Sequence, residues 1–475
     1  MHKQDHLQTL KLKNEIALPS LPPLNSLALP LLNRTGSEIF DRLFRSQAIA
    51  TLLESPANNT DRSTLTRYSI CAGSPKSIEH HPQIFTPAIG NILDCLRGLL
   101  ATVDLDETTK LPAHLPFTGG WVGWLGYEFA WEIERLPDLA PDSLPFPVAY
   151  WYAPNAFAIL DHWEQVLYLV APTDGELDGL VEKLERVEEG IQERRGDVEN
   201  QPQLDLLTSA AEYQQAILKA QQYIKAGDIF QTNISLRFRT ETALDSWEIY
   251  QRLQGINPSP FASYWQTPWG AMISCSPERL VQLQQQQAQT RPIAGTRKRG
   301  KDLATDLLLA EELATNTKEI AEHIMLVDLE RNDLGRVCRG GTIEVDELLA
   351  IERYSHVMHL VSNVTGKLDP KFDSIDLIRA MFPGGTITGC PKVSCMKIIA
   401  ELEPFPRNLF YGSCGYLDRR GNLDLNILIR TLLYQQGTVW GQVGAGIVAD
   451  SHPQQEWRES LQKAAAQITA LGIIS

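Results

Sequence analysis

Residues 211–238, AEYQQAILKAQQYIKAGDIFQTNISLRF, predict three elements in immediate succession. The apolar residues of the first half recur at helical spacing, Gly227 and Asp228 mark a turn, and the last residues favour a strand. Outward in both directions, short strands and helices follow one another without the regular strand–helix–strand repeat of a parallel sheet. The sequence therefore predicts an α+β fold in which antiparallel sheets are flanked by helices.

The segments on either side refine this prediction. Towards the N-terminus, 121–137 predicts a strand that turns into a helix, and 148–171 predicts two further strands. Towards the C-terminus, strands are expected around 271–283. The glutamine run at 284–287 is expected to be a solvated hairpin tip.

Helices are predicted at 302–327 and at 453–472, the second of them amphipathic. A charged helix that runs into a polar linker covers 175–203 and marks the best boundary in the chain. The expected organisation is a leader rich in Leu and Pro (1–35), a strand-rich N-terminal region (36–172), a charged helix and linker (173–208) and a C-terminal domain (209–472).

Composition excludes several classes of protein. The chain has 475 residues, of which 43% are hydrophobic and 21% charged, and its net charge is −15. This charge argues against general attraction to nucleic acid or anionic membranes, so the basic run RKRGK at 297–301 is a local feature. Seven cysteines without a CxxC pair favour a reducing compartment, and no apolar run could span a bilayer. We expect a cytoplasmic protein with no nucleic-acid or membrane partner.

Two predicted helical segments carry carboxylates three residues apart. Glu319 and Glu322 form one pair, and Glu456 and Glu459 form the other. Each pair lies on one helical face, where like charges destabilise the helix slightly unless a cation lies between them. Mg²⁺ prefers oxygen ligands of this kind. Taken alone, the pairs also fit an ordinary solvated acidic surface.

Other candidate residues have equally simple alternatives. Gly444, Ala445 and Gly446 could form a backbone nest that binds a carboxylate, or a plain tight turn. Glu278 precedes a predicted strand, where a closed pocket would raise its pKa; it could instead pair with Arg279 on the surface.

Three more candidates carry little weight individually. His359 has apolar neighbours, as buried core histidines do, and Thr386 lies in the glycine-rich PGGTITGCPK. Cys414 in YGSCGY is best interpreted as a buried structural cysteine rather than a nucleophile.

Taken in order, these segments resemble the chorismate-binding enzymes, which include anthranilate synthase component I, aminodeoxychorismate synthase component I, isochorismate synthase and salicylate synthase. The resemblance is dense over 210–470 and looser in the N-terminal part. The motifs that carry it are GDIFQ (227–231), NPSPF (257–261), SPERLV (276–281), PIAGTR (292–297), EHIMLVDLERNDLGRV (322–337), YSHVMHLVS (354–362), PGGTITGCPK (383–392), LNILIRT (425–431), GAGIVADS (444–451), LLES (52–55), RYS (67–69) and GGWVGWLGYE (119–128).

The resemblance implies two layered antiparallel sheets wrapped by helices, with 209–472 as the catalytic domain. It also implies that Glu322 and Glu459 ligate Mg²⁺ while Glu319 and Glu456 hold its waters. The Mg²⁺ ion would in turn fix the ring carboxylate of chorismate.

The remaining site residues follow from the same resemblance. Glu278 corresponds to the general acid that protonates the departing C4 hydroxyl, because a hydroxyl leaves more easily as water. His359 and Thr386 match positions tied to the loss of pyruvate and to substrate binding. The residues expected to contact the substrate are Ala294, Gly295, Thr296, Tyr411, Arg430, Lys463 and the backbone of Gly444, Ala445 and Gly446.

Two positions predict the product. Isochorismate and salicylate synthases have a lysine where Gln231 stands, and Gln cannot act as the base that activates water. Aminodeoxychorismate synthases often have a lysine in place of Ala294, which can attack C2 before amination at C4. The resemblance therefore favours direct amination at C2 to give anthranilate, with ammonia from a partner glutaminase. The alternatives are aminodeoxychorismate synthase component I and a non-catalytic chorismate-fold binding protein.

A regulatory site is also implied, but with departures from the family pattern. Glu54, Ser55, Asn257 and Pro258 match the allosteric site of anthranilate synthases that are inhibited by tryptophan. Three other residues differ from the usual ones: Ala262 replaces a methionine, Asn363 an arginine and Asn426 a cysteine. NPSPFASYW and the short N-terminal part resemble the aminodeoxychorismate branch.

Overall fold

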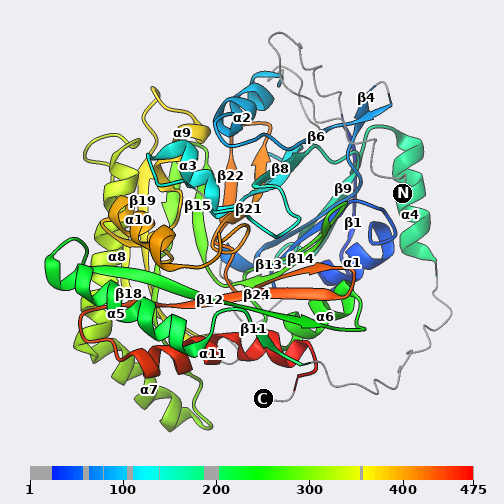
Figure 1. The fold of residues 1–475 in the computed structure, drawn as a ribbon. Helices are drawn as coiled ribbons and strands as arrows, with labels where there is room; N and C mark the ends of the chain where they lie inside the picture. Colours follow the sequence, from blue (N-terminus) through cyan, green and yellow to red (C-terminus); the bar gives the residue numbers. More distant parts are fainter. Residues whose placement is uncertain are drawn as a thin grey trace.

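Two large antiparallel sheets form the body of the protein, with helices around them (Figure 1). The computed structural model describes residues 24–56, 64–78, 80–103, 111–138, 140–186, 203–353 and 357–473. The predicted α+β fold with flanking helices is confirmed.

The first sheet has 12 strands and combines N-terminal and C-terminal segments of the chain. In spatial order they are β1 (Asn25–Pro30), β10 (Val166–Ala171), β9 (Phe157–Asp161), β3 (Tyr68–Ala72), β2 (Ala50–Glu54), β13 (Phe261–Thr267), β14 (Gly270–Ser276), β23 (Thr431–Gln435), β24 (Thr438–Ile447), β12 (Gln231–Glu241) and β11 (Asp205–Leu206), with β20 (Gly389–Cys390) also paired to β12.

The second sheet has 10 strands and likewise joins both parts of the chain. Its order is β17 (Ile293–Lys298), β19 (Val357–Lys367), β16 (Gln287–Thr290), β15 (Arg279–Gln284), β22 (Leu423–Asn426), β21 (Ser413–Asp418), β7 (Gly120–Leu125), β8 (Ala149–Tyr152) and β6 (Ile84–Phe85), with β18 (Glu344–Arg353) on β19. A separate pair joins β4 (Ser77–Ile78) to β5 (His81–Pro82).

The helices pack on the outside of both sheets. They are α1 (Gly36–Leu43), α2 (Ile92–Ala101), α3 (Ala130–Ile133), α4 (Asp174–Glu185), α5 (Ala210–Ala226), α6 (Ser246–Ile256), α7 (Leu303–Thr315), α8 (Thr317–Gly335), α9 (Ser374–Met381), α10 (Lys392–Leu402) and α11 (Pro453–Ala470). Helices α5, α6 and α11 lie together along one side of the sheet that contains β12 and β24 (Figure 1). None of the described helices is long and apolar enough to cross a membrane.

The succession predicted for 211–238 is confirmed. Helix α5 begins at a capping box, in which the Ser209 hydroxyl accepts from the Glu212 N–H and the Glu212 carboxylate accepts from the Ser209 N–H. It ends at Gly227, whose φ of 85° is the left-handed conformation that favours glycine. The chain then enters β12, which places Gln231 at the start of a strand in the middle of the molecule.

Two sequence predictions are corrected. Residues 148–171 form the three strands β8, β9 and β10, not two, because Pro154 and Asn155 interrupt the segment and β8 joins the other sheet. Residues 302–327 belong to two helices, because Asn316 ends α7 and caps α8 by accepting from the Glu319 N–H. This break fixes where the acidic pair of α8 begins.

Other local predictions agree with the structure. Gln285 and Gln286 have φ values of 49° and 70° and form the exposed turn between β15 and β16. Residues 121–137 contain β7 and α3, and 453–472 contain α11. The charged segment 175–203 contains most of α4, but residues 187–202 lie outside the described part of the chain.

Three arginines in and beside β17 form ion pairs with acidic residues of the same chain. Arg291 pairs with Glu347 at 2.8 Å, and Arg299 pairs with Asp306 at 2.7 Å. Arg297 pairs with Glu312 at 2.6 Å and with Glu319 at 3.0 Å, so it also ties α7 to α8. Both arginines of the run 297–301 are therefore engaged in ion pairs within the protein.

A buried arginine ties β12 of the first sheet to the segments around Tyr127 and Ile387. Arg407 is 1% exposed, and its Nη2 lies 2.6 Å from Glu403 Oε1. The same guanidinium donates to the backbone oxygens of Ile387 and Asn233 and stacks over the ring of Tyr127. Glu403 also accepts from the Ser235 N–H, so both charges are fully engaged.

We expect Arg407→Met to lower the free energy of unfolding by about 3–5 kcal/mol, because it leaves the buried Glu403 carboxylate without its cation. Urea denaturation measures this difference. Arg239→Met is the matched control, because its ion pair with Asp205 is exposed and should contribute less than about 1 kcal/mol. A loss below about 1 kcal/mol for Arg407→Met would contradict the assignment.

Candidate active site

The two predicted acidic pairs lie near the starts of two different helices. Glu319 and Glu322 lie in the first two turns of α8, and Glu456 and Glu459 lie at the start of α11. The positive charges of Lys318 and Lys463 lower the pKa of both Glu322 and Glu456, so the starts of the two helices lie within electrostatic range of each other. The two acidic pairs therefore lie in the same region of the molecule.

The electrostatics of this site reflect crowded negative charge. Burial raises the pKa of Glu322, and the neighbouring Glu319 carboxylate raises it further. Burial also raises the pKa of Glu456, and Glu459 adds to that rise. A cation between the helices would relieve this repulsion.

Internal donors engage three of these carboxylates. Gln231 Nε2 donates to Glu322 Oε1 at 2.9 Å, and Lys463 Nζ lies 2.9 Å from Glu459 Oε1. Arg297 pairs with Glu319. Within the part of the chain that the structure describes, no three acidic, histidine or cysteine side chains are grouped closely enough to hold a metal ion.

Two glycines of β24 form a narrow floor beside this acidic site. A Cβ added at Gly446 would lie 2.5 Å from Gln231 Nε2 and 3.5 Å from Glu322 Oε1. A Cβ added at Gly444 would lie 2.9 Å from both Asn233 Oδ1 and Tyr411 Oη. Lys463 Nζ donates to the Gly444 carbonyl oxygen at 3.3 Å. The residues 444–446 therefore lie in a strand paired with β12, and both the tight-turn and the backbone-nest interpretations are wrong, because successive N–H groups of a strand point in opposite directions.

Tyr411 and Arg430 are held in unusual backbone conformations. Their φ values are 64° and 53°, which ordinary side chains rarely adopt, and the Tyr411 N–H donates to the Leu428 oxygen at 2.9 Å. Burial lowers the pKa of Arg430. Among the described residues its guanidinium has no ion pair, so it is available to an anion. Strained residues of this kind cluster at functional sites.

A bulge in β17 brings the second sheet to the same place. The register with β19 shifts between Ala294 and Thr296, at Gly295, whose φ is 71°. A Cβ on Gly295 would lie 3.0 Å from Glu319 Oε2, so the glycine permits the close approach of α8. Thr296 Oγ1 lies 2.9 Å from His359 Nδ1.

His359 is a buried and neutral imidazole. Burial lowers its pKa to about 4, and the nearby charge of Arg430 lowers it in the same direction. The histidine therefore lies within electrostatic range of Arg430 and contacts Thr296, rather than serving as an isolated core residue.

Glu278 is the most strongly perturbed carboxyl group of the site. It is 5% exposed, and burial raises its pKa to about 8. Hydrogen bonds from the Thr386 hydroxyl and from the backbone of Ile293, next to Ala294, lower the pKa of the same carboxyl group, but by less than burial raises it. Arg279 pairs instead with Asp424 at 2.8 Å, which excludes the alternative of a surface ion pair with Glu278.

The structure thus brings the predicted catalytic, substrate and metal residues into one connected site between β12, β24, β17, β19, α8 and α11. Their individual roles stay predictions. Cys414 lies outside this group: it is buried, and burial raises the pKa of its thiol to about 12, as expected of a structural cysteine.

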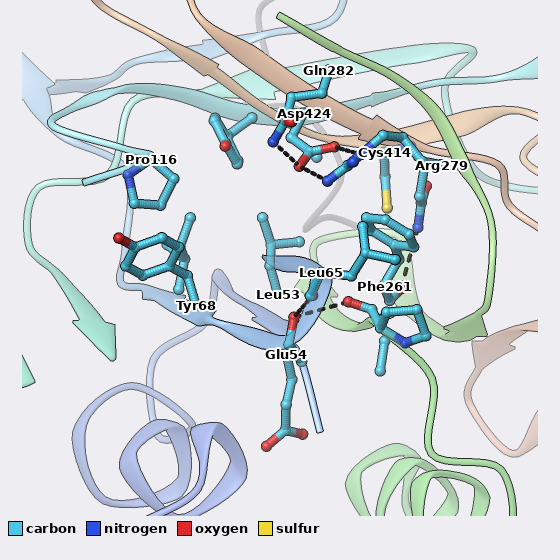
Figure 2. Close-up of a pocket in the computed structure, with 17 residues that line it drawn as sticks. Leu53, Glu54, Leu65, Tyr68, Pro116, Phe261, Arg279, Gln282, Cys414 and Asp424 are labelled. Atoms are coloured by element: carbon cyan, nitrogen blue, oxygen red, sulfur yellow. Dashed lines mark hydrogen bonds and ion pairs between the residues drawn. The ribbon is translucent and has the colours of Figure 1, made fainter. Parts of the chain in front are cut away.

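The predicted regulatory residues surround a different place. A cavity of about 100 Å³ is lined by Glu54, Ser55, Phe261, Ala262 and Asn426, among others. In Figure 2 the Glu54 carboxylate points away from this cavity; it accepts from the Ser37 and Tyr250 hydroxyls.

Not all four predicted regulatory residues line the cavity. Asn257 and Pro258 do not line it. Asn257 Nδ2 instead donates to the backbone oxygen of Cys275 at 3.2 Å. The opposite wall holds the Arg279–Asp424 pair, which Gln282 joins through a hydrogen bond (Figure 2). A regulatory role for this cavity stays a prediction.

Sequence reasoning missed two polar residues of the site. Asn233 lies two positions after Gln231 on β12, and this alternation is visible in the sequence. Glu330 is a buried acid whose pKa burial raises to about 7, and its charge raises the pKa of Glu278. It lies about two turns beyond Glu322 on the same helix, and no spacing pattern in the sequence distinguishes it from its neighbours.

Comparison with known proteins gives a consistent result. Residues 49–469 match the model of the chorismate binding enzyme family. The chain is 59% identical to the anthranilate synthase component I-like protein of Synechocystis sp. over 462 residues, 96% of this chain and 93% of that one. It is 39% identical to aminodeoxychorismate synthase component 1 of Bacillus subtilis, covering 91% of this chain and 93% of that one.

A solved structure agrees with the fold. The crystal structure of anthranilate synthase component I from Streptococcus pneumoniae superposes with a TM-score of 0.73 at 28% identity, covering 87% of this chain and 95% of that one.

Proposed function

Because this chain belongs to the chorismate-binding enzyme family and resembles anthranilate synthase component I, we propose that it aminates chorismate at C2 and eliminates pyruvate to give anthranilate. The observation that carries this proposal is the buried Ala294 on β17, which is 8% exposed and presents no nucleophile. Ammonia must then attack C2 itself.

Gln231 supports the choice of ammonia over water. Its amide donates a hydrogen bond to Glu322, and an amide is not basic enough to remove a proton from water. Ammonia already carries a reactive lone pair and needs no base before it attacks. The residue at the start of β12 therefore favours amination over hydration.

The remaining groups suit a dicarboxylate substrate that loses a hydroxyl group. Arg430 and Lys463 offer positive charge for carboxylates, and the glycine floor of β24 leaves room for the substrate beside them. Glu278 is protonated at neutral pH and can give its proton to the leaving C4 hydroxyl. His359 and Thr386 lie beside these groups and are assigned to substrate binding and the loss of pyruvate.

The two acidic pairs fit Mg²⁺. Their donors are carboxylate oxygens, and like charge crowds them until a cation is present. We assign Glu322 and Glu459 as ligands and Glu319 and Glu456 as the residues that hold bound water. When bound, Mg²⁺ would neutralise the ring carboxylate of chorismate and fix its position.

We assign the source of ammonia to a separate glutaminase subunit. The basis is the resemblance to component I of synthases that are named as having two components. The second candidate product is 4-amino-4-deoxychorismate, which the 39% identity to aminodeoxychorismate synthase component 1 supports.

The deciding experiment is a product assay. The purified protein is incubated with chorismate, Mg²⁺ and an ammonium salt, and products are separated and identified by mass and fluorescence. We expect anthranilate and pyruvate in equal amounts. Accumulation of 4-amino-4-deoxychorismate without pyruvate would contradict this proposal and support the second candidate function.

Replacing Ala294 by Lys tests the same conclusion from the other side. We expect anthranilate formation to fall at least about tenfold, because the long side chain would occupy the space in front of C2 and its amine would compete with ammonia. Ala288→Lys is unsuitable as a control because that residue is fully buried. Leu307→Lys on the exposed face of α7 is the better comparison. Full activity of Ala294→Lys would show that this position does not face C2.

A further inference from the structure

Two buried amide side chains of β12 present oxygens that have no partner. Gln231 is 4% exposed and Asn233 is 8% exposed. Among the described residues, neither Gln231 Oε1 nor Asn233 Oδ1 accepts a hydrogen bond. A buried acceptor without a donor costs roughly 1–3 kcal/mol, so two in one place call for an explanation.

The orientation of the Gln231 amide is fixed by its neighbour. Its Nε2 donates to Glu322 Oε1 at 2.9 Å, and a flipped amide would set oxygen against a carboxylate oxygen. The Gln231 oxygen therefore faces away from the carboxylate. Asn233 is two residues further along β12, so strand alternation places it on the same side of the sheet.

Both residues lie against the glycine floor of β24. Gly446 is paired in register with Asn233, and a Cβ on it would approach Gln231. A Cβ on Gly444 would lie 2.9 Å from Asn233 Oδ1. The two oxygens thus belong to the site that contains Glu322, Lys463 and Tyr411.

The chemistry of the oxygens selects the ligand. Carbonyl oxygens accept hydrogen bonds and repel carboxylates, so they do not bind the anionic groups of chorismate. They fit a small donor. Ammonia has three N–H groups and one lone pair, so two acceptors can hold it and leave the lone pair free to react.

We propose that Gln231 and Asn233 form the binding site for the ammonia nucleophile, holding two of its N–H groups so that its lone pair is directed at the ring. This inference rests on the proposed function. In the reaction the lone pair forms the C2–N bond, the two ring double bonds each shift by one position, and the C4–O bond breaks. The hydroxyl leaves as water with the proton of Glu278, and the new ammonium group then loses one proton to solvent.

An unpartnered buried amide oxygen is not sufficient by itself. Gln467 on α11 is fully buried, and its Oε1 also lacks a partner among the described residues. Its Nε2 donates to the Thr431 oxygen at 2.9 Å, away from the acidic pairs. Gln467 therefore serves as a control of the same chemical kind outside the site.

The test uses Asn233, because it does not contact a proposed metal ligand. Asn233→Leu keeps the number and branching of the side-chain heavy atoms and removes the acceptor, whereas Asn233→Asp keeps an oxygen at the same place. Initial rates are measured with ammonium chloride as nitrogen source, varying ammonium and chorismate independently. We expect Asn233→Leu to raise KM for ammonium about tenfold, the effect of one lost hydrogen bond, while KM for chorismate changes less than threefold.

The controls separate positioning from folding. Asn233→Asp should have a KM for ammonium at or below the wild-type value, and Gln467→Leu should leave that KM unchanged even if its melting temperature falls. The proposal is overturned if Asn233→Leu leaves KM for ammonium unchanged, if it raises both KM values equally, or if Asn233→Asp matches Asn233→Leu.

The outcome is distinguishable from a failure of the proposed function. The product in every reaction is identified, so a shift in KM for ammonium with 4-amino-4-deoxychorismate as product would keep the ammonia site and reject amination at C2. Anthranilate as product with no shift in KM for ammonium would keep amination at C2 and reject the ammonia site.

Discussion

Glu278→Gln should lower kcat with chorismate about a thousandfold. The amide keeps the size of the side chain and can still donate a hydrogen bond, but its N–H groups are too weakly acidic to protonate the leaving C4 hydroxyl. Initial rates of pyruvate release at pH 7 measure the loss. Unchanged turnover would remove Glu278 from the chemistry, and absence of turnover in the wild-type protein as well would favour a non-catalytic binding protein.

Glu128→Gln is the matched control for this variant. Glu128 is also buried, and burial raises its pKa to about 7, but its Oε1 accepts from the Arg407 N–H rather than facing the site. A glutamine retains that acceptor. We expect its turnover to stay within twofold of the wild-type value.

The pH dependence of the wild-type protein has a defined sign. Glu278 works as an acid, so the rate should fall as pH rises through its pKa of about 8. Because its folded-state pKa is raised, its contribution to stability is present at low pH and is lost as pH rises through about 8. Glu278→Gln should therefore melt at a higher temperature relative to wild type at pH 9 than at pH 6.

Removal of Mg²⁺ should abolish turnover, by at least about a hundredfold, and added Mg²⁺ should restore it. Without the cation, the carboxylates of α8 and α11 repel each other and the ring carboxylate of the substrate, a cost of several kcal/mol. A chelator followed by titration with MgCl₂ measures the effect. Undiminished turnover in the chelator would exclude a metal role for the acidic pairs.

Direct binding of the ion identifies the ligands. Calorimetric titration with Mg²⁺ should show at least about tenfold weaker binding for Glu322→Gln and for Glu459→Gln. Glu311→Gln removes an exposed carboxylate of the neighbouring helix α7 and should bind Mg²⁺ as the wild-type protein does. Equal binding by all three variants would place the ion elsewhere.

Much of the fold was predictable because its signals are local. The helix, turn and strand of 211–238 each depend on residues that are close in sequence, and so does the spacing of Glu319 and Glu322. The errors arose where contacts with other elements determine which sheet a strand joins or where a helix ends. Nothing local shows that β8 leaves the sheet of β9, or that Asn316 ends one helix and starts the next.

The site was predictable in its membership and less so in its physical state. A resemblance could name Glu278, but its raised pKa depends on burial between segments that are distant in sequence. The left-handed backbone of Tyr411 and Arg430 and the bulge at Gly295 are likewise set by tertiary packing. Asn233 was missed because an amide in a strand is unremarkable until its oxygen is found without a donor.

The way the two parts of the chain share their sheets limits how the protein can be shortened or recombined. In the first sheet β2 pairs with β13, and in the second sheet β7 pairs with β21. In each sheet a strand of the N-terminal region is therefore hydrogen-bonded directly to a strand of the C-terminal region. A chain that lacked residues 36–172 would expose two long unpaired strand edges, which are templates for aggregation. The N-terminal region therefore protects one strand edge in each sheet of the part of the chain that holds the site, and we expect the C-terminal part alone to aggregate.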